Sequence, residues 1–205
     1  IFLKKVVPLY RYIQYKIQSM KKIITILAFL CAALTTIYAE RVVLGAEQTK
    51  QYLPLLKGKR VALLSNHTGI VIQGKDTIHT LDLLLKHGVE VTAIFSPEHG
   101  FRGTAREGEH VASSVDAKTG IPILSLYDGK SQRPSKEAMQ TFDILITDIQ
   151  DVGLRFYTYY VTMYRLMNAC ASEGKQFMVF DRPNPNGFYV DGPILDMKHK
   201  SGVGA

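Results

Sequence analysis

The feature that most constrains the fold of this chain is a repeated alternation of short apolar runs with helix-like segments. Runs that are apolar throughout, rather than at every second position, are typical of strands buried on both faces of a sheet. Strands of this kind that alternate with helices predict an α/β fold, a parallel sheet with helices on both faces. The predicted strands cover residues 60–65, 89–95, 121–127, 142–149 and 176–181.

The helical segments are predicted from apolar spacing and from end signals. The stretch DTIHTLDLLLKHG, residues 76–88, has Asp76 as the expected N-cap, apolar residues along one face and Gly88 as its stop. PSKEAMQ, residues 134–140, predicts a short helix, and residues 158–173 predict a longer one. No internal repeat, low-complexity tract or linker interrupts this alternation, so we expect a single folded domain.

The positive charge of the chain is concentrated at its N-terminus. The sequence has 25 Lys and Arg residues and 18 Asp and Glu residues, and residues 1–39 hold six of the basic residues and no acid. The rest of the chain therefore has 25 − 6 = 19 basic residues against 18 acidic ones. Nucleic-acid binding needs clustered Lys and Arg, so we expect no nucleic-acid partner.

Residues 20–39, MKKIITILAFLCAALTTIYA, have the order of a secretory signal peptide: a positive start, an apolar stretch and a small residue at the end. The apolar stretch is shorter than the roughly 20 residues that span a membrane. We therefore expect a secreted protein, periplasmic or extracellular, with no membrane association after cleavage. Residues 1–19 precede the only plausible start methionine and are expected to be over-extended translation, which leaves residues 40–205 as the folded domain.

Each predicted strand is followed by a polar turn that contains glycine, in the stretches SNHTG, SPEHGFRG, YDGKSQRP, TDIQDVGLRFYTY and DRPNPNG. The carboxyl ends of parallel strands share one edge, where open α/β sheets bind ligands. A single polar residue there can be a cap, a turn or an ion-pair partner, but unpaired charges are expensive to bury, and a whole group is harder to explain structurally. The candidates are Asn66, His67, Glu98, His99, Arg102, Asp148, Gln150, Asp151, Arg155, Asp181, Arg182 and Asn184.

Several kinds of chemistry are not supported by these motifs. No GxGxxG or Walker-type loop follows a strand, and SNHTG is not the GxSxG elbow, so we predict no cofactor and no nucleophile at Ser65. Cys170 is expected to be a small buried side chain rather than a catalytic thiol. A metal site from His67, Glu98 and His99 stays open as an alternative, weakened by the lack of an HExxH-like spacing.

Carboxylate chemistry fits the motifs better. Glu98 follows an apolar strand, and partial desolvation would raise its pKa and make it a proton donor near neutral pH. Asp148, Asp151 or Asp181 could supply a second carboxylate, and two carboxylates are the usual equipment of glycoside hydrolysis. Faces suited to sugar packing, or alternatively to packing at a helix start, come from Tyr157, Tyr159 and Tyr160.

In this order, SNHTG, SPEHGFRG, DIQDVGLRFYTY and DRPNPNG resemble the NamZ-type exo-β-N-acetylmuramidases, also known as the YbbC-like family. The resemblance runs from about Val42 to the end of the sequence. It implies a Rossmann-like catalytic domain over residues 40–205, followed in the family by a smaller C-terminal α/β domain that this sequence lacks, with the active site in the cleft between them. It also implies a secreted glycosidase of cell-wall turnover that releases N-acetylmuramic acid from the non-reducing ends of peptidoglycan fragments.

The resemblance places the catalytic glutamate at Glu98. Arg102 or Arg155 would pair with the lactyl carboxylate of the substrate, because a guanidinium grips a carboxylate through two hydrogen bonds. A non-catalytic cell-wall glycan-binding domain and a metal-assisted hydrolase remain the alternatives. The expected catalytic residues are Glu98, His99 and Asp148, and the expected substrate-binding residues are Asn66, His67, Arg102, Gln150, Arg155, Tyr157, Asp181, Arg182 and Asn184.

Overall fold

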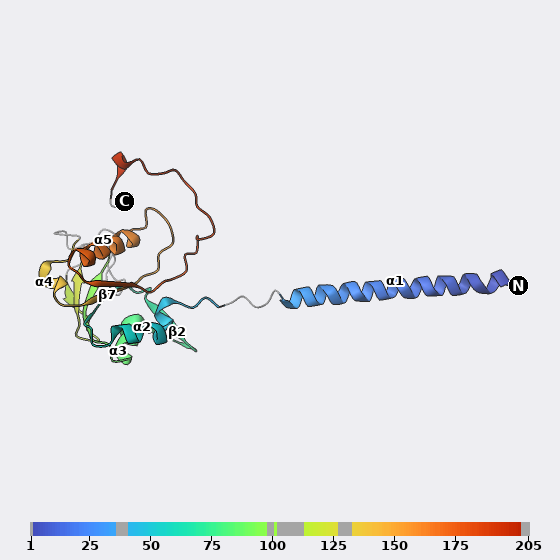
Figure 1. Ribbon diagram of the computed structural model, residues 1–205, viewed down its shortest axis with the longest axis horizontal. Helices are drawn as coiled ribbons and strands as arrows, with labels where there is room; N and C mark the ends of the chain where they lie inside the picture. Colours follow the sequence, from blue (N-terminus) through green and yellow to red (C-terminus); the bar gives the residue numbers. More distant parts are fainter. Residues whose placement is uncertain (1, 36–40, 98–100, 102–112, 127–132, 202–205) are drawn as a thin grey trace. The chain divides into compact units, whose positions relative to one another are not determined.

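The computed structural model describes residues 2–35, 41–97, 101, 113–126 and 133–201 (Figure 1). The chain divides into two compact units, residues 1–42 and 43–205. The first unit consists of helix α1 (Phe2–Thr35), which runs through both of the predicted N-terminal segments. In the part of the chain that is described, no helix combines the length and the apolar character needed to cross a membrane. The assignment of residues 1–19 and 20–39 stays a prediction.

The second unit is built on a mixed, mostly parallel sheet, whose described strands lie in the order β5-β6-β4-β1-β7-β8. Five of them are parallel, and β5 pairs with β6 in the antiparallel sense. The strands are β1 (Val61–Ser65), β4 (Val91–Ser96), β5 (Ser114–Val115), β6 (Pro122–Ser125), β7 (Ile144–Asp148) and β8 (Gln176–Val179).

The order of the parallel strands places a topological switch in the middle of the sheet. Counted along the chain, these strands stand in the order 3-2-1-4-5, with β1 between β4 and β7. The chain leaves β1 toward one edge and later returns to build the other side, which opens a crevice at the carboxyl ends of β1 and β7. The predicted α/β, Rossmann-like fold is confirmed, with the correction that β5 makes the sheet mixed.

Helices cover both faces of this sheet, and the strand residues alternate between two cores (Figure 1). Val61 and Leu63 of β1 pack in the core that includes residues of α2 and α3. Ala62 and Leu64 pack in the core that includes residues of α4 and α5. All four side chains are fully buried, which explains why β1 is apolar at every position. The helices are η1 (Gly45–Glu47), α2 (Thr49–Leu56), α3 (Thr80–Lys86), α4 (Lys136–Met139), α5 (Tyr159–Ser172) and η2 (Met197–His199).

The predicted helix over residues 76–88 is wrong at its start. Residues 76–79 instead form β3 (Asp76–His79), which pairs with β2 (Ile70–Gln73) in a hairpin whose turn places Gly74 at a φ of +66°. A positive φ is what a tight hairpin turn requires and what glycine adopts at little strain. Helix α3 begins only at Thr80, and its N-cap is His79, whose Nδ1 accepts a hydrogen bond from the Leu81 backbone N–H at 3.1 Å.

The other predicted elements are confirmed with small shifts at their ends. Helix α4 has Ser135 as its N-cap, because the Ser135 Oγ accepts a hydrogen bond from the Ala138 N–H at 3.2 Å. Helix α5 ends before Gly174, whose φ of +64° lets the chain turn into β8. The predicted end of the third strand at Tyr127 lies outside the described residues.

Candidate active site

The carboxyl ends of β1 and β7 are joined by side chains that belong to the predicted motifs. The Ser65 Oγ donates to the Asp148 carbonyl oxygen at 2.8 Å. Asn66 is fully buried, and its Oδ1 accepts from the Thr68 backbone N–H at 2.9 Å and from the Thr68 Oγ at 2.6 Å. A Cβ at Gly69 would lie 2.2 Å from the Ser65 Oγ, so a larger residue there would displace the Ser65 hydroxyl from its hydrogen bond with Asp148. The SNHTG segment therefore has a structural role: its hydrogen bonds, centred on Asn66, join the carboxyl ends of β1 and β7.

Asp148, which accepts from Ser65 through its backbone carbonyl, also forms a buried ion pair through its side chain. The Arg182 Nε donates to the Asp148 Oδ1 at 2.5 Å, and the Arg182 Nη2 donates to the Asp148 Oδ2 at 3.1 Å. The Asp148 side chain is 0% exposed and the Arg182 side chain 6%. The Thr80 hydroxyl also donates to Asp148, and the Arg182 Nη2 donates to the Ile70 carbonyl oxygen at 3.0 Å. Because both carboxylate oxygens are engaged, Asp148 fastens the segment after β8 to the sheet edge.

Gln150 links three loops of the edge. Its backbone N–H donates to the Thr68 Oγ at 3.0 Å, and its Nε2 donates to the Pro183 carbonyl oxygen at 2.8 Å. Gly153 then packs closely on Asn184, since a Cβ at Gly153 would lie 2.4 Å from the Asn184 Nδ2. Gly153 also has a φ of +71°, so two independent constraints favour glycine there. The motifs SNHTG, DIQDVG and DRPNPNG are thus brought into one structure, as the sequence predicts for a shared edge.

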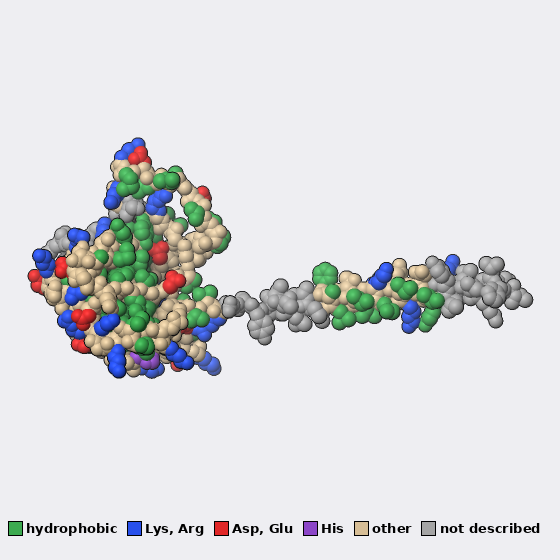
Figure 2. Space-filling view, viewed as in Figure 1, with side chains coloured by type: hydrophobic (Ala, Val, Ile, Leu, Met, Phe, Trp, Pro, Cys, Tyr) green, Lys and Arg blue, Asp and Glu red, His purple; other side chains and the backbone are tan. Residues whose placement is uncertain are grey.

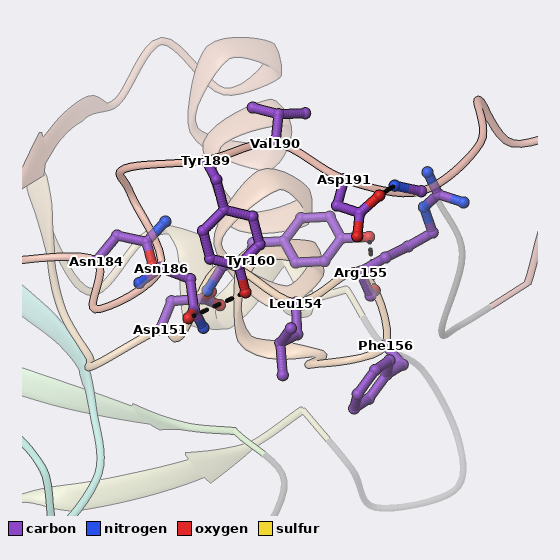
Figure 3. Close-up of a pocket in the computed structure, with 12 residues that line it drawn as sticks. Asp151, Leu154, Arg155, Phe156, Tyr160, Asn184, Asn186, Tyr189, Val190 and Asp191 are labelled. Atoms are coloured by element: carbon purple, nitrogen blue, oxygen red, sulfur yellow. Dashed lines mark hydrogen bonds between the residues drawn. The ribbon is translucent and has the colours of Figure 1, made fainter.

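A cavity of about 850 Å³ lies between the β7–α5 loop and the segment that follows β8 (Figure 3). The Arg155 Nη2 donates across the cavity wall to the Pro193 carbonyl oxygen at 2.6 Å, and the Tyr160 hydroxyl donates to the Arg155 carbonyl oxygen at 3.1 Å. The rings of Tyr160 and Tyr189 lie in the middle of the view in Figure 3, with Arg155 and Asp191 at one end. The lining residues are Asp151, Gly153, Leu154, Arg155, Phe156, Tyr160, Asn184, Asn186, Tyr189, Val190, Asp191 and Gly192.

The predicted site residues do not all meet at this cavity. Arg155 and Asn184 line it. Asp181 instead lines a separate cavity of about 290 Å³ beside Tyr52 and Gly45. His67 is exposed after β1, and Tyr157 is half-buried against the Tyr159 ring, with ring centroids 5.0 Å apart. Glu98, His99 and Arg102 lie outside the described residues, so their place relative to the cavity stays a prediction.

Within the described part of the chain, the buried side-chain atoms without a hydrogen-bond partner all belong to this edge. They are the Asn66 Nδ2, the Thr147 Oγ and the Asp151 Oδ2. Burying a polar atom without a partner costs free energy, so such atoms are rare in structures and need an explanation. Their concentration at the ends of β1 and β7 marks the edge as the part of the domain where stability is not the only constraint.

Two buried titratable groups, Tyr52 and Cys170, have clearly raised pKa values. Burial, and then the nearby Asp148 carboxylate, raise the pKa of Tyr52 to about 12, and its hydroxyl donates to the Ala46 carbonyl oxygen at 3.0 Å. Burial also raises the pKa of the Cys170 thiol to about 11, so it holds little of the reactive thiolate at neutral pH. The prediction that Cys170 is a buried apolar side chain agrees with its 1% exposure.

Among the described residues, no group of three or more His, Cys, Asp or Glu side chains is arranged to hold a metal ion. The metal alternative depends on Glu98 and His99, which are not described, so it is not tested by this result.

Sequence reasoning missed several residues that line the cavity. Asn186, Tyr189 and Asp191 belong to the stretch NPNGFYVDG, which has no regular secondary structure. The signal that could have found them is the pair of aromatic residues in a segment rich in Asn, Asp and Gly. Figure 2 shows apolar side chains at the surface of the segment after β8, where Phe188, Val190 and Ile194 are 84%, 100% and 97% exposed.

Comparison of the sequence with known proteins finds NamZ proteins, and comparison of the structure finds DUF1343 family proteins. The family described as exo-beta-N-acetylmuramidase NamZ, N-terminal, matches residues 61–205. The peptidoglycan beta-N-acetylmuramidase NamZ of Bacillus subtilis (strain 168) is 46% identical over 155 residues, which cover 75% of this chain and 36% of that protein.

Two crystal structures of DUF1343 family proteins from Bacteroides fragilis NCTC 9343 are also similar. They are 58% and 37% identical in sequence, with TM-scores of 0.68 and 0.69, and each comparison covers 80% of this chain and 41% of the solved chain. The chain thus spans about a third of the curated relative and less than half of the solved structures. With a family match over 145 of its 205 residues, the chain belongs to the family of NamZ N-terminal domains.

Proposed function

We propose that this chain is the N-terminal part of a secreted glycosidase that releases N-acetylmuramic acid from the non-reducing ends of peptidoglycan fragments. The observation that carries the proposal is its 46% identity to the Bacillus subtilis peptidoglycan beta-N-acetylmuramidase over 155 residues. The family model of NamZ N-terminal domains matches residues 61–205, which include the parallel strands and the motifs at their carboxyl edge. The partners in this proposal are peptidoglycan-derived glycans that end in N-acetylmuramic acid.

Glu98 is the general acid in this proposal, and His99 lies beside it in the sequence. Glu98 follows β4 by two residues, and β4 ends next to β1, whose other neighbour is β7. The two strands on either side of β1 thus end at the same edge of the sheet, where we expect Glu98 to lie. A carboxyl group that is partly removed from water there would donate a proton to the leaving oxygen.

Asp148 has a different role in the proposed mechanism. Its carboxylate is fully buried and is engaged by Arg182 and Thr80, so it does not reach a substrate in this conformation. We assign it as a positioning residue that holds Arg182 and the segment after β8 against the edge. Asn66 and Gln150 act in the same way, since their hydrogen bonds fix the loops around the cavity. Of the predicted substrate-binding residues, Arg155 and Asn184 line the cavity.

The test is release of N-acetylmuramic acid, measured by mass spectrometry from muramic-acid-terminated fragments and from a chromogenic N-acetylmuramic acid glycoside. The full chain is assayed beside a version extended with the C-terminal part of the Bacillus subtilis relative. Glu98→Gln is expected to reduce release at least about a hundred-fold, because removal of a general acid typically costs 10²–10⁴ in rate. Glu90→Gln is the matched control, since Glu90 is exposed just before the amino end of the same strand.

The outcomes separate the competing functions. Retained release by Glu98→Gln would contradict the assignment of the general acid. Glycan binding without release by either version would favour a non-catalytic binding domain. Loss of release with a chelator, restored by a divalent metal, would favour the metal-assisted hydrolase.

A further inference from the structure

The cavity beside the β7–α5 loop has the size and construction of a ligand site. Its volume of about 850 Å³ falls within the range of roughly 300–1,000 Å³ that is typical of small-molecule sites. One wall is the loop over residues 151–156, which is tied to the sheet edge by Gln150. The other is the segment over residues 184–192, which is anchored by Arg182 on Asp148 and by the Asn186 Nδ2 on the Val152 carbonyl oxygen at 2.8 Å. Both walls are therefore held by hydrogen bonds within the chain.

The lining combines aromatic faces with unused hydrogen-bonding groups. Tyr189 is 51% exposed and Phe156 is 65% exposed, so both rings offer faces to a ligand. The Tyr160 hydroxyl donates its proton to the Arg155 carbonyl oxygen, which leaves its oxygen free to accept. The Asn184 Oδ1 accepts from the Asn186 N–H, which leaves the Asn184 amide NH₂ to donate. Flat apolar faces beside neutral donors and acceptors suit the C–H face and the hydroxyl groups of a sugar ring.

The charges of the lining decide between two kinds of sugar. Asp151 and Asp191 carry negative charge, and Arg155 carries the only positive charge among the described lining residues. One Arg155 nitrogen is already bound to the Pro193 carbonyl oxygen. Among the described lining residues, a ligand carboxylate would therefore meet more negative than positive charge, which disfavours it and argues against the expected pairing of Arg155 with a lactyl carboxylate. Peptidoglycan strands alternate two acetamido sugars, of which N-acetylmuramic acid carries a carboxylate and N-acetylglucosamine does not.

We propose that this cavity is a binding site for an uncharged acetamido sugar of the N-acetylglucosamine type, with Tyr189 and Tyr160 as its contact residues. This inference rests on the proposed function, in which such a sugar is linked to the released muramic acid. It also assigns cavity residues, Tyr189 and Asp191 among them, that the sequence motifs do not indicate.

The test uses the full 205-residue chain and measures sugar binding by ligand-observed NMR titration, which needs no turnover. N,N′-diacetylchitobiose serves as the neutral acetamido sugar and N-acetylmuramic acid as the anionic one. Tyr189→Ala is expected to raise the Kd for diacetylchitobiose by about three- to ten-fold, since an aromatic contact contributes about that much. Tyr164→Ala is the matched control, because Tyr164 on α5 is 55% exposed and does not line the cavity.

A second variant tests the charge argument. Asp191→Asn keeps the Oδ1 that accepts from the Gly192 N–H at 2.6 Å but removes the negative charge. It is expected to tighten binding of N-acetylmuramic acid and to leave diacetylchitobiose binding within about two-fold. Circular dichroism confirms that each variant is folded.

Two binding results would overturn the proposal, and so would one kinetic result. One is that diacetylchitobiose does not bind, or binds equally to the wild type and to Tyr189→Ala. The other is that N-acetylmuramic acid is the sugar whose binding depends on Tyr189. Failure of the proposed function is distinguishable, because it shows as absent release in the mass-spectrometric assay while the Tyr189-dependent binding persists. Release with an unaltered KM in the extended Tyr189→Ala variant would keep the function and reject this sugar site.

Discussion

Asp148 and Arg182 form a buried contact between residues 34 positions apart, and several loops of the site depend on it. Two charges removed from water are stable only when their geometry and hydrogen bonds are nearly complete. Here the two side chains share two hydrogen bonds, and Thr80 and the Ile70 carbonyl oxygen take up remaining capacity. The pair therefore gains its stability from the completeness of the network rather than from the charges alone.

Arg182→Met is expected to lower the free energy of unfolding by about 3–5 kcal/mol, because it leaves the buried Asp148 carboxylate without a cation. The measurement is urea denaturation followed by circular dichroism. Lys198→Met, at the exposed Lys198–Asp196 pair, is the control and is expected to cost less than about 1 kcal/mol.

The double variant Arg182→Met with Asp148→Asn is expected to regain part of the lost stability, since it removes the unpaired charge as well. If the double variant is less stable than Arg182→Met alone, the explanation from an uncompensated buried carboxylate fails.

At the level of elements, the amino ends of β1 and β7 are joined by a different ion pair. The Asp143 Oδ2 accepts from the Arg60 backbone N–H at 2.9 Å, and the Asp143 Oδ1 accepts from the Arg60 Nη2 at 2.7 Å. The side-chain hydrogen bond from Arg60, followed by the one from its backbone N–H, lowers the pKa of Asp143 to about 2. The two central strands are thus fixed at both ends, by an exposed pair at the amino edge and a buried pair at the carboxyl edge.

This lowered pKa predicts how the amino-edge pair depends on pH. The pKa of Asp143 is about 2 in the folded chain, against roughly 3.9 for an unfolded aspartate. The folded state therefore gains stability from the ionised carboxylate above about pH 4, and this gain is lost as the pH falls toward 2. The difference in urea midpoint between wild type and Asp143→Asn should shrink between pH 5 and pH 2.

Arg60→Met provides the matching control, because it removes the side-chain partner but keeps the backbone N–H that also donates to Asp143, and it should reduce the same pH-dependent difference. A wild-type-minus-Asp143→Asn difference that stays constant down to pH 2 would contradict the link between this pair and β1–β7 stability.

At the level of the whole molecule, the chain separates into two units, and all residues of the two described cores lie in the second. The first described core residue is Ala46, which follows the expected cleavage point after Ala39. Removal of the N-terminal segment therefore takes no side chain from either core.

Export is accordingly expected to yield a chain that begins at Glu40 and keeps its stability. N-terminal sequencing of the protein from the envelope fraction or the medium checks the first part. A variant that begins at Glu40 should have a free energy of unfolding in urea within about 0.5 kcal/mol of that of the full chain, since no core contact is lost. An uncleaved N-terminus in the exported protein would contradict the signal-peptide prediction.

Much of the fold could be predicted from the sequence because hydrophobic periodicity is a local property. Residues 61–65 are apolar on both faces of the strand, so both faces must be buried. The helical segments that alternate with the strands in the sequence are the elements that can bury them. The same reasoning placed Asn66, Asp148, Gln150 and Arg182 at one edge. The β2–β3 hairpin was not predicted, because the apolar spacing within residues 76–88 also suits a helix. Residues 76–79 form a strand only because they pair with β2 across the turn at Gly74.

Only the tertiary structure decided which polar side chains are buried and which line a cavity. Asp181 and Arg182 are neighbours in the sequence, yet Asp181 lines a cavity beside Tyr52 while Arg182 is buried on Asp148. Consecutive side chains of an extended segment point to opposite sides, so two charged residues that are neighbours in the sequence lie in different environments. The alternation of strands and helices, the shared edge and its motifs were set by the amino-acid sequence alone. The roles of Asp148, Tyr189 and Asp191 arise from contacts between distant segments, because burial and charge depend on what the folded chain places around each group.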